Sequence, residues 1–280
     1  MPYQLLILPK SWFVSDVHPD KFRVLSHIVN KGYSKPMAQY GIITSPRIKD
    51  PAHFLESLSL GPETSEEGAK EKDYSIMLLL GSKADYNHLE ATSGYRRIFN
   101  KEVWPLSGCR DSDIPSELSG EFGSLCEKTV EHVVLGPTDP VDSDIADRVL
   151  ATIGFKSYGD DGTFQDKDVS PTTCHYEITA FTSFRRGIGT RLIEYCVDEF
   201  FRSPHATLLK PQHVETAVLH AIVITQHDLV PFYQNKCGFA PSTHPDVWIN
   251  VRGTDSPLED GITATRDFSV SFMRRDIYVG

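Results

Sequence analysis

Short apolar runs alternate with amphipathic stretches along the first half of the chain. The apolar runs predict buried strands at residues 3–8, 74–80 and 148–155. From Asp20 to Lys31 the apolar residues recur at helical spacing, which predicts a helix that Gly32 ends. Asp50, followed by Pro51 in a first helical turn, predicts a second, shorter helix. The first half is therefore expected to run strand, two helices, strand, strand.

Two stretches of the first half show little periodicity. Residues 59–73 are polar and charged and predict a loop. Residues 83–146 are the least regular part of the chain, with one apolar run at 132–135 that predicts a strand. We interpret both stretches as insertions in a single domain over residues 1–280, with 1–170 as its N-terminal part.

The second half, residues 171–280, shows a regular succession of strand and helix patterns. Cys174–Phe181 predicts a strand, and the amphipathic stretch after it predicts a helix to about Arg202. Thr216–Ile224 is apolar on both faces apart from His220, as in a strand covered on both sides. Strand, helix and strand in this order form a βαβ unit, so the two strands should be parallel. A short helix and two closing strands follow, at Asp228–Lys236, Val247–Asn250 and Phe268–Met273.

The composition is that of a globular protein and excludes several classes. A chain of 280 residues with 40 % apolar residues can bury a full core, so disorder of the whole chain is excluded. Its 28 basic and 38 acidic residues give a net charge of −10. This charge argues against a general nucleic-acid binder and mildly favours cationic substrates such as amines.

Cysteine usage and the N-terminus bear on the compartment. Five cysteines without a CxxC pair are typical of reduced thiols in an intracellular protein. The first residues lack the basic segment and long apolar run of a signal peptide. No stretch approaches the roughly 20 apolar residues of a membrane helix. We therefore expect a protein of the cytoplasm, or of the nucleus, without a membrane partner.

A glycine turn lies between the strand Cys174–Phe181 and the helix that follows. It consists of Arg185, Arg186, Gly187, Ile188, Gly189 and Thr190. Glycines let the backbone approach a ligand, and the helix N-terminus and the arginines attract anions, so the turn suits a pyrophosphate. A tight turn with solvent-exposed arginines is the alternative. A dinucleotide fingerprint lacks its third glycine, because Leu192 stands there, and the Gly-Lys-Ser/Thr ending of a P-loop is absent.

The second half resembles the GCN5-related N-acetyltransferase (GNAT) superfamily over roughly residues 172–240. The resemblance rests on Glu177–Phe181, on Phe184–Thr190 with the helix and strand after it, and on Asp228–Phe239. It implies an α/β fold with a mixed, splayed sheet of about six or seven strands and helices on both faces. It also implies acetyl-CoA as the co-substrate, with no metal.

The resemblance assigns roles to individual residues. The turn Arg185–Thr190 would bind the pyrophosphate of acetyl-CoA, and backbone amides near Thr179, Ala180 and Phe181 would pair with the pantetheine arm. The side chain of Gln226 stands where many members carry an Asn that contacts the same arm. Tyr233 would be the general acid that protonates the leaving thiolate. The family usually has Gln or Arg where Phe184 stands, which leaves open how each amide pairs with each phosphate oxygen.

An acceptor amine arrives as an ammonium and must lose a proton before it attacks, so a base is needed. Glu177 and His175 are two apart on one strand and share a face, which makes them the first and second candidates. Pairing of Glu177 with a nearby arginine, and a surface position for His175, are the structural alternatives. His220 is interpreted as a satisfied core histidine. No cluster of His, Cys, Asp and Glu has metal-ligand spacing.

These observations lead to one functional hypothesis and three rivals. We expect an acetyl-CoA-dependent N-acetyltransferase that transfers the acetyl group directly from the thioester to an amine. As the acceptor, a small-molecule amine is favoured over a protein. Residues 83–146 would cover the acceptor and set specificity. A protein or peptide N-terminal acetyltransferase, a catalytically silent acyl-CoA-binding module, and acyl transfer to oxygen or of a longer acyl group are the alternatives.

Overall fold

The computed structural model describes nine segments of the chain. They are residues 3–15, 19–61, 73–81, 125, 129–158, 170–184, 187–209, 213–252 and 262–279. Most of the predicted insertions 59–73 and 83–146, and the arginines Arg185 and Arg186, lie outside these described residues. Every helix in the described segments is too short or too polar to span a bilayer.

The elements follow the predicted succession closely. The strands are β1 Tyr3–Pro9, β2 Tyr74–Leu80, β3 Val130–Val134, β4 Val149–Ser157, β5 Thr173–Ser183, β6 Thr216–Ile224, β7 Ala240–Pro241, β8 Val247–Ile249 and β9 Phe268–Tyr278. The α-helices are α1 Lys10–Val14, α2 Pro19–Tyr40, α3 Phe54–Ser57, α6 Ser143–Arg148, α7 Ile188–Asp198 and α8 Leu229–Cys237. Single 3₁₀ turns cover Pro51–His53, Phe200–Arg202, Pro204–Leu208 and Thr225–His227.

One mixed sheet joins all nine described strands, where the resemblance implied six or seven. Its order is β3-β1-β2-β4-β5-β6-β9-β7, and β8 also pairs with β9. The six or seven strands implied by the resemblance were too few; the patterns along the chain predict eight, and the two-residue β7 carries no readable periodicity. Only β1–β3 and β5–β6 are parallel among the described pairs, so the predicted βαβ unit is confirmed.

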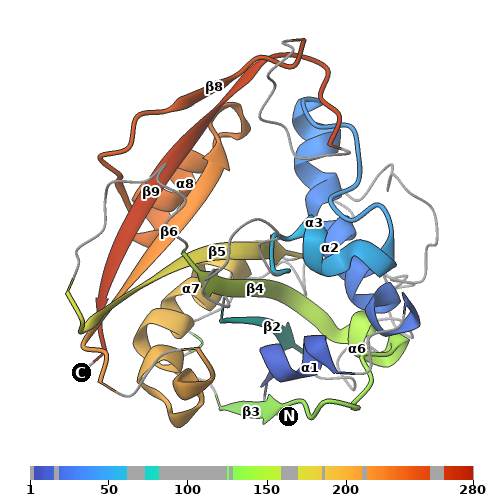
Figure 1. Ribbon diagram of the computed structural model, residues 1–280, viewed down its shortest axis with the longest axis vertical. Coiled ribbons are helices and arrows are strands. Elements are labelled where there is room, and N and C mark those ends of the chain that lie inside the picture. The colour runs from blue at the N-terminus through green and yellow to red at the C-terminus, as the bar shows by residue number, and fades with distance from the viewer. Residues whose placement is uncertain are drawn as a thin grey trace, which may run out of the picture.

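Helices cover both faces of the sheet, as expected (Figure 1). On β1 the side chains alternate, with Leu5 and Ile7 in one apolar cluster and Leu6 and Leu8 in the other. The first cluster contains residues of α7 and α8, and the second contains residues of α1, α2 and α3. The period of two along each strand therefore divides the core into two layers.

Helix α2 is longer than predicted, because Gly32 does not end it. A Cβ on Gly32 would lie 2.1 Å from Cγ2 of Thr182 on β5. The glycine therefore serves close packing between helix and strand. The helix continues to Tyr40 and ends at Gly41, whose φ is +63° and whose N–H donates to the carbonyl of Met37 at 3.0 Å.

Part of the predicted insertion 83–146 belongs to the sheet. Strand β3 pairs with the outer edge of β1, near the predicted run 132–135, and α6 leads directly into β4. The predicted short helix at Asp50 is confirmed, since the Asp50 carboxylate accepts a hydrogen bond from the N–H of Ala52 at 2.9 Å.

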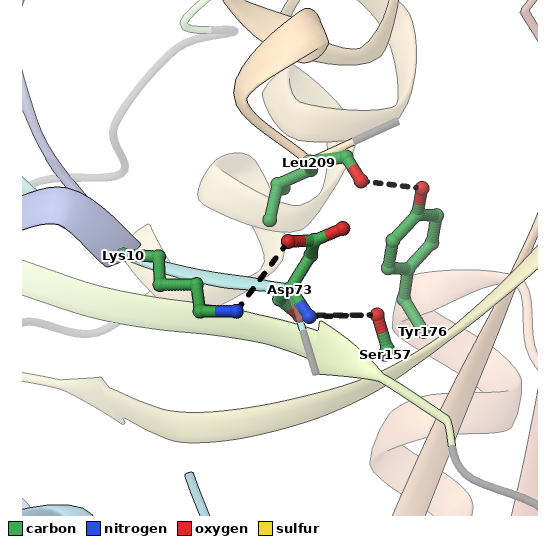
Figure 2. Close-up of polar contacts among 5 residues, drawn as sticks. All are labelled: Lys10, Asp73, Ser157, Tyr176 and Leu209. Atoms are coloured by element: carbon green, nitrogen blue, oxygen red, sulfur yellow. Dashed lines mark hydrogen bonds and ion pairs between the residues drawn. The ribbon is translucent and has the colours of Figure 1, made fainter. Parts of the chain in front are cut away.

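Polar contacts fasten the start of β2 and the end of β4 to the neighbouring segments (Figure 2). The N–H of Asp73 donates to Oγ of Ser157 at 3.2 Å, and the Asp73 carboxylate lies 3.8 Å from Nζ of Lys10. Tyr176 of β5 is buried and donates its hydroxyl to the carbonyl of Leu209 at 3.1 Å, which anchors the turns after α7. These contacts hold the end of the sheet from which β5 starts.

Candidate functional site

Strands β5 and β6 separate partway along their length. They pair from Thr173 to Glu177 on β5 and from Thr216 to His220 on β6. Within the described segments the pairing of these two strands stops at Glu177 and His220, and β6 and β9 slope away from β4 and β5 (Figure 1). We call the last paired position, Glu177 with His220, the vertex.

A β-bulge lies on β5 just beyond the vertex. Thr152 of β4 pairs with Thr182 and Gly154 pairs with Thr179, so β5 carries one extra residue in this interval. Ala180 has a φ of +46°, and its carbonyl accepts a hydrogen bond from the hydroxyl of Thr152. The predicted residues Thr179, Ala180 and Phe181 thus lie at a bulge on the β5 edge that has parted from β6, where an extended ligand could pair with backbone.

The glycine turn leads from β5 into α7. Gly187 has a φ of +80° and precedes α7, while Ile188 and Gly189 are buried in its first turn. A Cβ on Gly189 would lie 3.2 Å from Cζ of Phe181, so the start of the helix packs closely on the bulged strand. The first turn, which also contains Thr190, has no acidic residue and no side-chain cap. Its N–H groups and the positive end of the helix dipole suit an anion.

Tyr233 of α8 packs against the bulge. Its ring lies 6.2 Å from that of Phe181 and 5.1 Å from that of Phe239, measured between centroids. Burial raises the pKa of the Tyr233 phenol well above its ordinary value, with Cys237 and Tyr33 adding to the effect. The phenol is therefore protonated at neutral pH and chemically able to donate a proton.

Gln226 is held by the neighbouring strand. Its Nε2 donates to Oγ of Ser269 at 3.0 Å, and its Oε1 accepts from the Ser269 N–H at 3.1 Å. The side-chain amide therefore fixes the turn after β6 to β9. A contact between Gln226 and a pantetheine arm stays a prediction.

Glu177 forms an ion pair with a lysine. Its Oε1 lies 3.1 Å from Nζ of Lys156 on β4, and the lysine side chain is 9 % exposed. The same Nζ donates to the carbonyl of Leu58 at 3.4 Å. Glu177 thus neutralises a buried ammonium, which is the structural alternative foreseen for it, although with a lysine as the partner.

His175 is joined to His220 by a hydrogen bond. Nδ1 of His175 lies 2.9 Å from Nε2 of His220. The His220 side chain, 4 % exposed, also stacks on Tyr158 with ring centroids 3.9 Å apart and planes 3° from parallel. His220 is a buried histidine with a polar partner, as the sequence predicted, and that partner is the histidine considered as a base.

The strand registers set these residues in two adjacent rows on one face of the sheet. Lys156 pairs with Glu177, Glu177 with His220 and His220 with Arg274, while His175 pairs with Val218 and Val218 with Asp276. We call the polar members the vertex patch, defined as Lys156, Tyr158, His175, Glu177, His220, Arg274 and Asp276. Most of them were missed by sequence reasoning, although a lysine within the apolar run 149–157 was a signal.

Two further features concern possible metal ligands and a histidine outside the vertex patch. In the described segments no group of three or more His, Cys, Asp or Glu residues could hold a metal ion. Away from the vertex, Nε2 of His132 on β3 lies 2.8 Å from the hydroxyl of Tyr195 on α7. That contact lies under the edge of the sheet and does not include the predicted site residues.

Comparison with known proteins gives a family and several more distant likenesses. The model of the family described as sporulation protein RMD6 matches residues 1–277. The chain is 28 % identical over 278 residues to sporulation protein RMD6 of Saccharomyces cerevisiae, covering 99 % of this chain and 96 % of that protein.

Two acetyltransferases are among the solved structures to which the chain is similar. One is a proposed phosphinothricin N-acetyltransferase, with 13 % identity, a TM-score of 0.36 and 99 % of each chain covered. The other is a ribosomal-protein-alanine N-acetyltransferase from Brucella melitensis, with 15 % identity, a TM-score of 0.26 and 46 % of this chain and 62 % of that chain covered. Likenesses this distant leave the assignment of a function to the residues of the chain itself.

Proposed function

The chain belongs to the family of sporulation protein RMD6, and we propose that it is an N-acetyltransferase that moves an acetyl group directly from acetyl-CoA to an amine. One observation carries the proposal. Strands β5 and β6 part at Glu177 and His220, immediately before a bulge at Ala180 and in front of the N-terminus of α7. This arrangement offers backbone to an extended arm and a helix terminus to its phosphates.

The residues that would hold acetyl-CoA lie along this path. Backbone groups of Thr179, Ala180 and Phe181 would pair with the amides of the pantetheine arm, as an added strand does. The N–H groups of the first turn of α7, from Gly187 to Thr190, would bind the pyrophosphate, and Arg185 and Arg186 would add charge. Gly187 supports this role, because its positive φ turns the chain into the helix without a side chain beside the phosphates.

Tyr233 would act as the general acid. When the amine attacks the thioester carbon, the C–N bond forms, the C–S bond breaks and its electron pair leaves with sulfur. The thiolate takes the phenolic proton of Tyr233, and the nitrogen releases one N–H proton to solvent as the amide forms. Solvent then returns a proton to the phenolate. The position of the Tyr233 ring, 6.2 Å from the ring of Phe181 beside the bulge, supports the assignment.

The proposed acceptor is the amine of a small molecule. The net charge of −10 favours approach of cations. A protein or peptide N-terminal amine is the second acceptor class. A silent acyl-CoA-binding module is the rival of a different kind, since it would need the helix terminus of α7 but not the phenol of Tyr233. Cytoplasmic or nuclear location remains part of the proposal.

A thermal-shift titration with acetyl-CoA, CoA and NAD tests the cofactor. A ligand at about 100 times its Kd adds roughly 2.7 kcal/mol to the free energy of unfolding. For a chain of this size the melting midpoint should rise by several degrees, at about 2–4 °C per kcal/mol. We expect this shift with both CoA species and none with NAD. No shift with either CoA species would overturn the proposal.

Tyr233→Phe separates an enzyme from a silent binder. We expect kcat for thiol release with an amine panel to fall about 10²–10⁴-fold, the range of general acid catalysis, while the acetyl-CoA shift is kept. Tyr195→Phe, at a buried tyrosine that bonds His132 instead, is the matched control and should keep full turnover. Equal turnover in both variants would remove Tyr233 from the reaction.

A further inference from the structure

We propose that His175 and His220 act as one proton-accepting unit, which takes up the proton that the acceptor ammonium must lose. The inference rests on the proposed acetyl transfer and deepens it, because it assigns the base. His220 would be the catalytic group, since it lies at the vertex, and His175 would be the positioning residue, two register pairs before the vertex.

The other charges of the vertex patch are already matched. Lys156 and Glu177 form an ion pair at 3.1 Å. The guanidinium of Arg274 donates to both carboxylate oxygens of Asp276, from Nε at 2.8 Å and from Nη2 at 3.2 Å. The two cations of the patch are therefore paired with its two carboxylates. The patch also contains two imidazoles, and imidazole is the type of side chain that changes charge near neutral pH.

The hydrogen bond makes the two imidazoles a single unit for protons. Between Nδ1 of His175 and Nε2 of His220, 2.9 Å apart, one ring must donate and the other accept. Both rings cannot be protonated without turning two N–H groups toward each other, so the pair accepts one proton and resists a second. Such coupled groups titrate in steps that belong to the pair.

The surroundings can stabilise a proton held for a short time. Tyr158 stacks flat on His220 and presents its π face to the ring, which favours a cation. The carboxylate of Glu177, the register partner of His220, adds negative charge, and the ammonium of Lys156 and the guanidinium of Arg274 oppose it. Burial also disfavours the charge, so the proton is received and passed on rather than kept.

The proton balance of the step is simple. An N–H bond of the ammonium breaks, directly or across one water, and its electron pair stays on the amine nitrogen. The proton forms a new N–H bond on Nδ1 of His220, since Nε2 of that ring is bonded to His175, and the imidazole unit becomes a cation. The freed pair attacks the thioester carbon, and the unit returns its proton to solvent after the thiol leaves.

The kinetic test uses the full chain with acetyl-CoA and the best amine from the panel. His220→Asn and His175→Asn should each lower kcat/KM about 10²-fold at pH 7, and less than about tenfold near pH 10, where the amine deprotonates unaided. The double variant should lose no more than the worse single variant, because the rings act as a unit. His213→Asn, at an exposed histidine, is the control and should match the parent protein.

The coupling of the two imidazoles can also be measured without catalytic turnover. In NMR titrations of the imidazole resonances, His175 and His220 should respond to the same protonation step, and His175→Asn should move the step seen at His220. Independent titration of the two rings would overturn the proposal. So would parent-like pH profiles in variants that still show the acetyl-CoA thermal shift. If the parent protein binds no acetyl-CoA, the proposed function itself is overturned. The thermal shift measures that binding independently of the imidazole titration.

Discussion

The two faces of the sheet are built differently where β5 meets β6. On the face toward α7 and α8, one apolar cluster runs without a break from β1 through β5 and β6 to β9. On the face toward α2, the main apolar cluster ends on β5 at Ala180 and includes no described residue of β6 or β9. A small separate cluster around Ile42, Ile249 and Phe268 lies farther along, and the vertex patch lies on the same face.

The difference shows how one sheet can be both stable and reactive. The continuous face holds the two parts of the sheet together by burial of apolar surface. The interrupted face can then carry charges, because each is matched within the patch, where unmatched charges would be costly to bury. On the same face, the segment after α2 is joined to the segment before β9, because the backbone of Thr44 and Ile42 pairs with that of Thr263 and Thr265.

The largest expected effect comes from a substitution that disrupts the packing of α2 against the interrupted face. A Cβ on Gly32 would meet not only Cγ2 of Thr182 but also its Cβ, at 2.2 Å, which no rotamer can relieve. We expect Gly32→Ala to lower the free energy of unfolding by about 3 kcal/mol, although alanine favours a helix. Urea unfolding measures it. Ala38→Ser, exposed on the same helix, is the control and should change stability by about 0.5 kcal/mol.

The charge match of the vertex patch can be broken at Glu177. Glu177→Gln leaves the ammonium of Lys156 buried without its carboxylate, so we expect a loss of about 3 kcal/mol in the free energy of unfolding. Lys156→Met added to Glu177→Gln should restore most of it, since no unpaired charge remains. A loss below about 1 kcal/mol would mean that the pair is screened by solvent.

The same variant separates the two base candidates. Where Glu177→Gln is still folded, we expect its kcat/KM to fall by less than about tenfold, because the carboxylate only adds negative charge beside the imidazole unit, which is the proposed base. A loss of about 10²-fold at neutral pH in the folded variant would instead make Glu177 the base. Circular dichroism at the assay temperature checks that the variant is folded.

Acid should loosen the contact between α2 and the turn after β6. His227 of that turn stacks on Tyr40, and burial, with Arg266 nearby, lowers its pKa to about 4. The folded state then binds fewer protons than the unfolded state, so this stability is full above about pH 6.5 and falls toward pH 4, by at most about 3 kcal/mol. His227→Gln should flatten the fall in melting midpoint over that range. An equally steep fall in the variant would assign the acid loss to other groups.

The smallest change in the free energy of unfolding is expected at the glycine turn, on the continuous face. Gly187 has a φ of +80°, and a Cβ added to it would have no atom within 4 Å, so a substitution there meets backbone strain but no clash. We expect Gly187→Ala to lower the free energy of unfolding by about 1 kcal/mol, and Gly187→Asn by less, because asparagine tolerates this conformation. Equal losses would contradict the conformational reason.

Local patterns were sufficient for most elements of the fold. The apolar runs predicted β2 and β6 to the residue, and β1, β4 and β5 to within a few residues. The end of α2 was misread at Gly32, since a glycine that ends a helix and one that packs against a strand look alike in sequence. The predicted strand Val247–Asn250 is confirmed as β8, whereas the two-residue strand β7 was missed, because it depends on pairing with β9, which local periodicity does not encode.

The sequence by itself determined the order of strands and helices, the parallel βαβ unit and the glycine turn, because these depend on periodicity and residue type within short windows. The tertiary structure decided the bulge at Ala180, the parting of β5 and β6, and the partners of Glu177 and His175. Lys156, Glu177, His220 and Arg274 come from four strands far apart in the chain, and only the register of those strands brings them into one row.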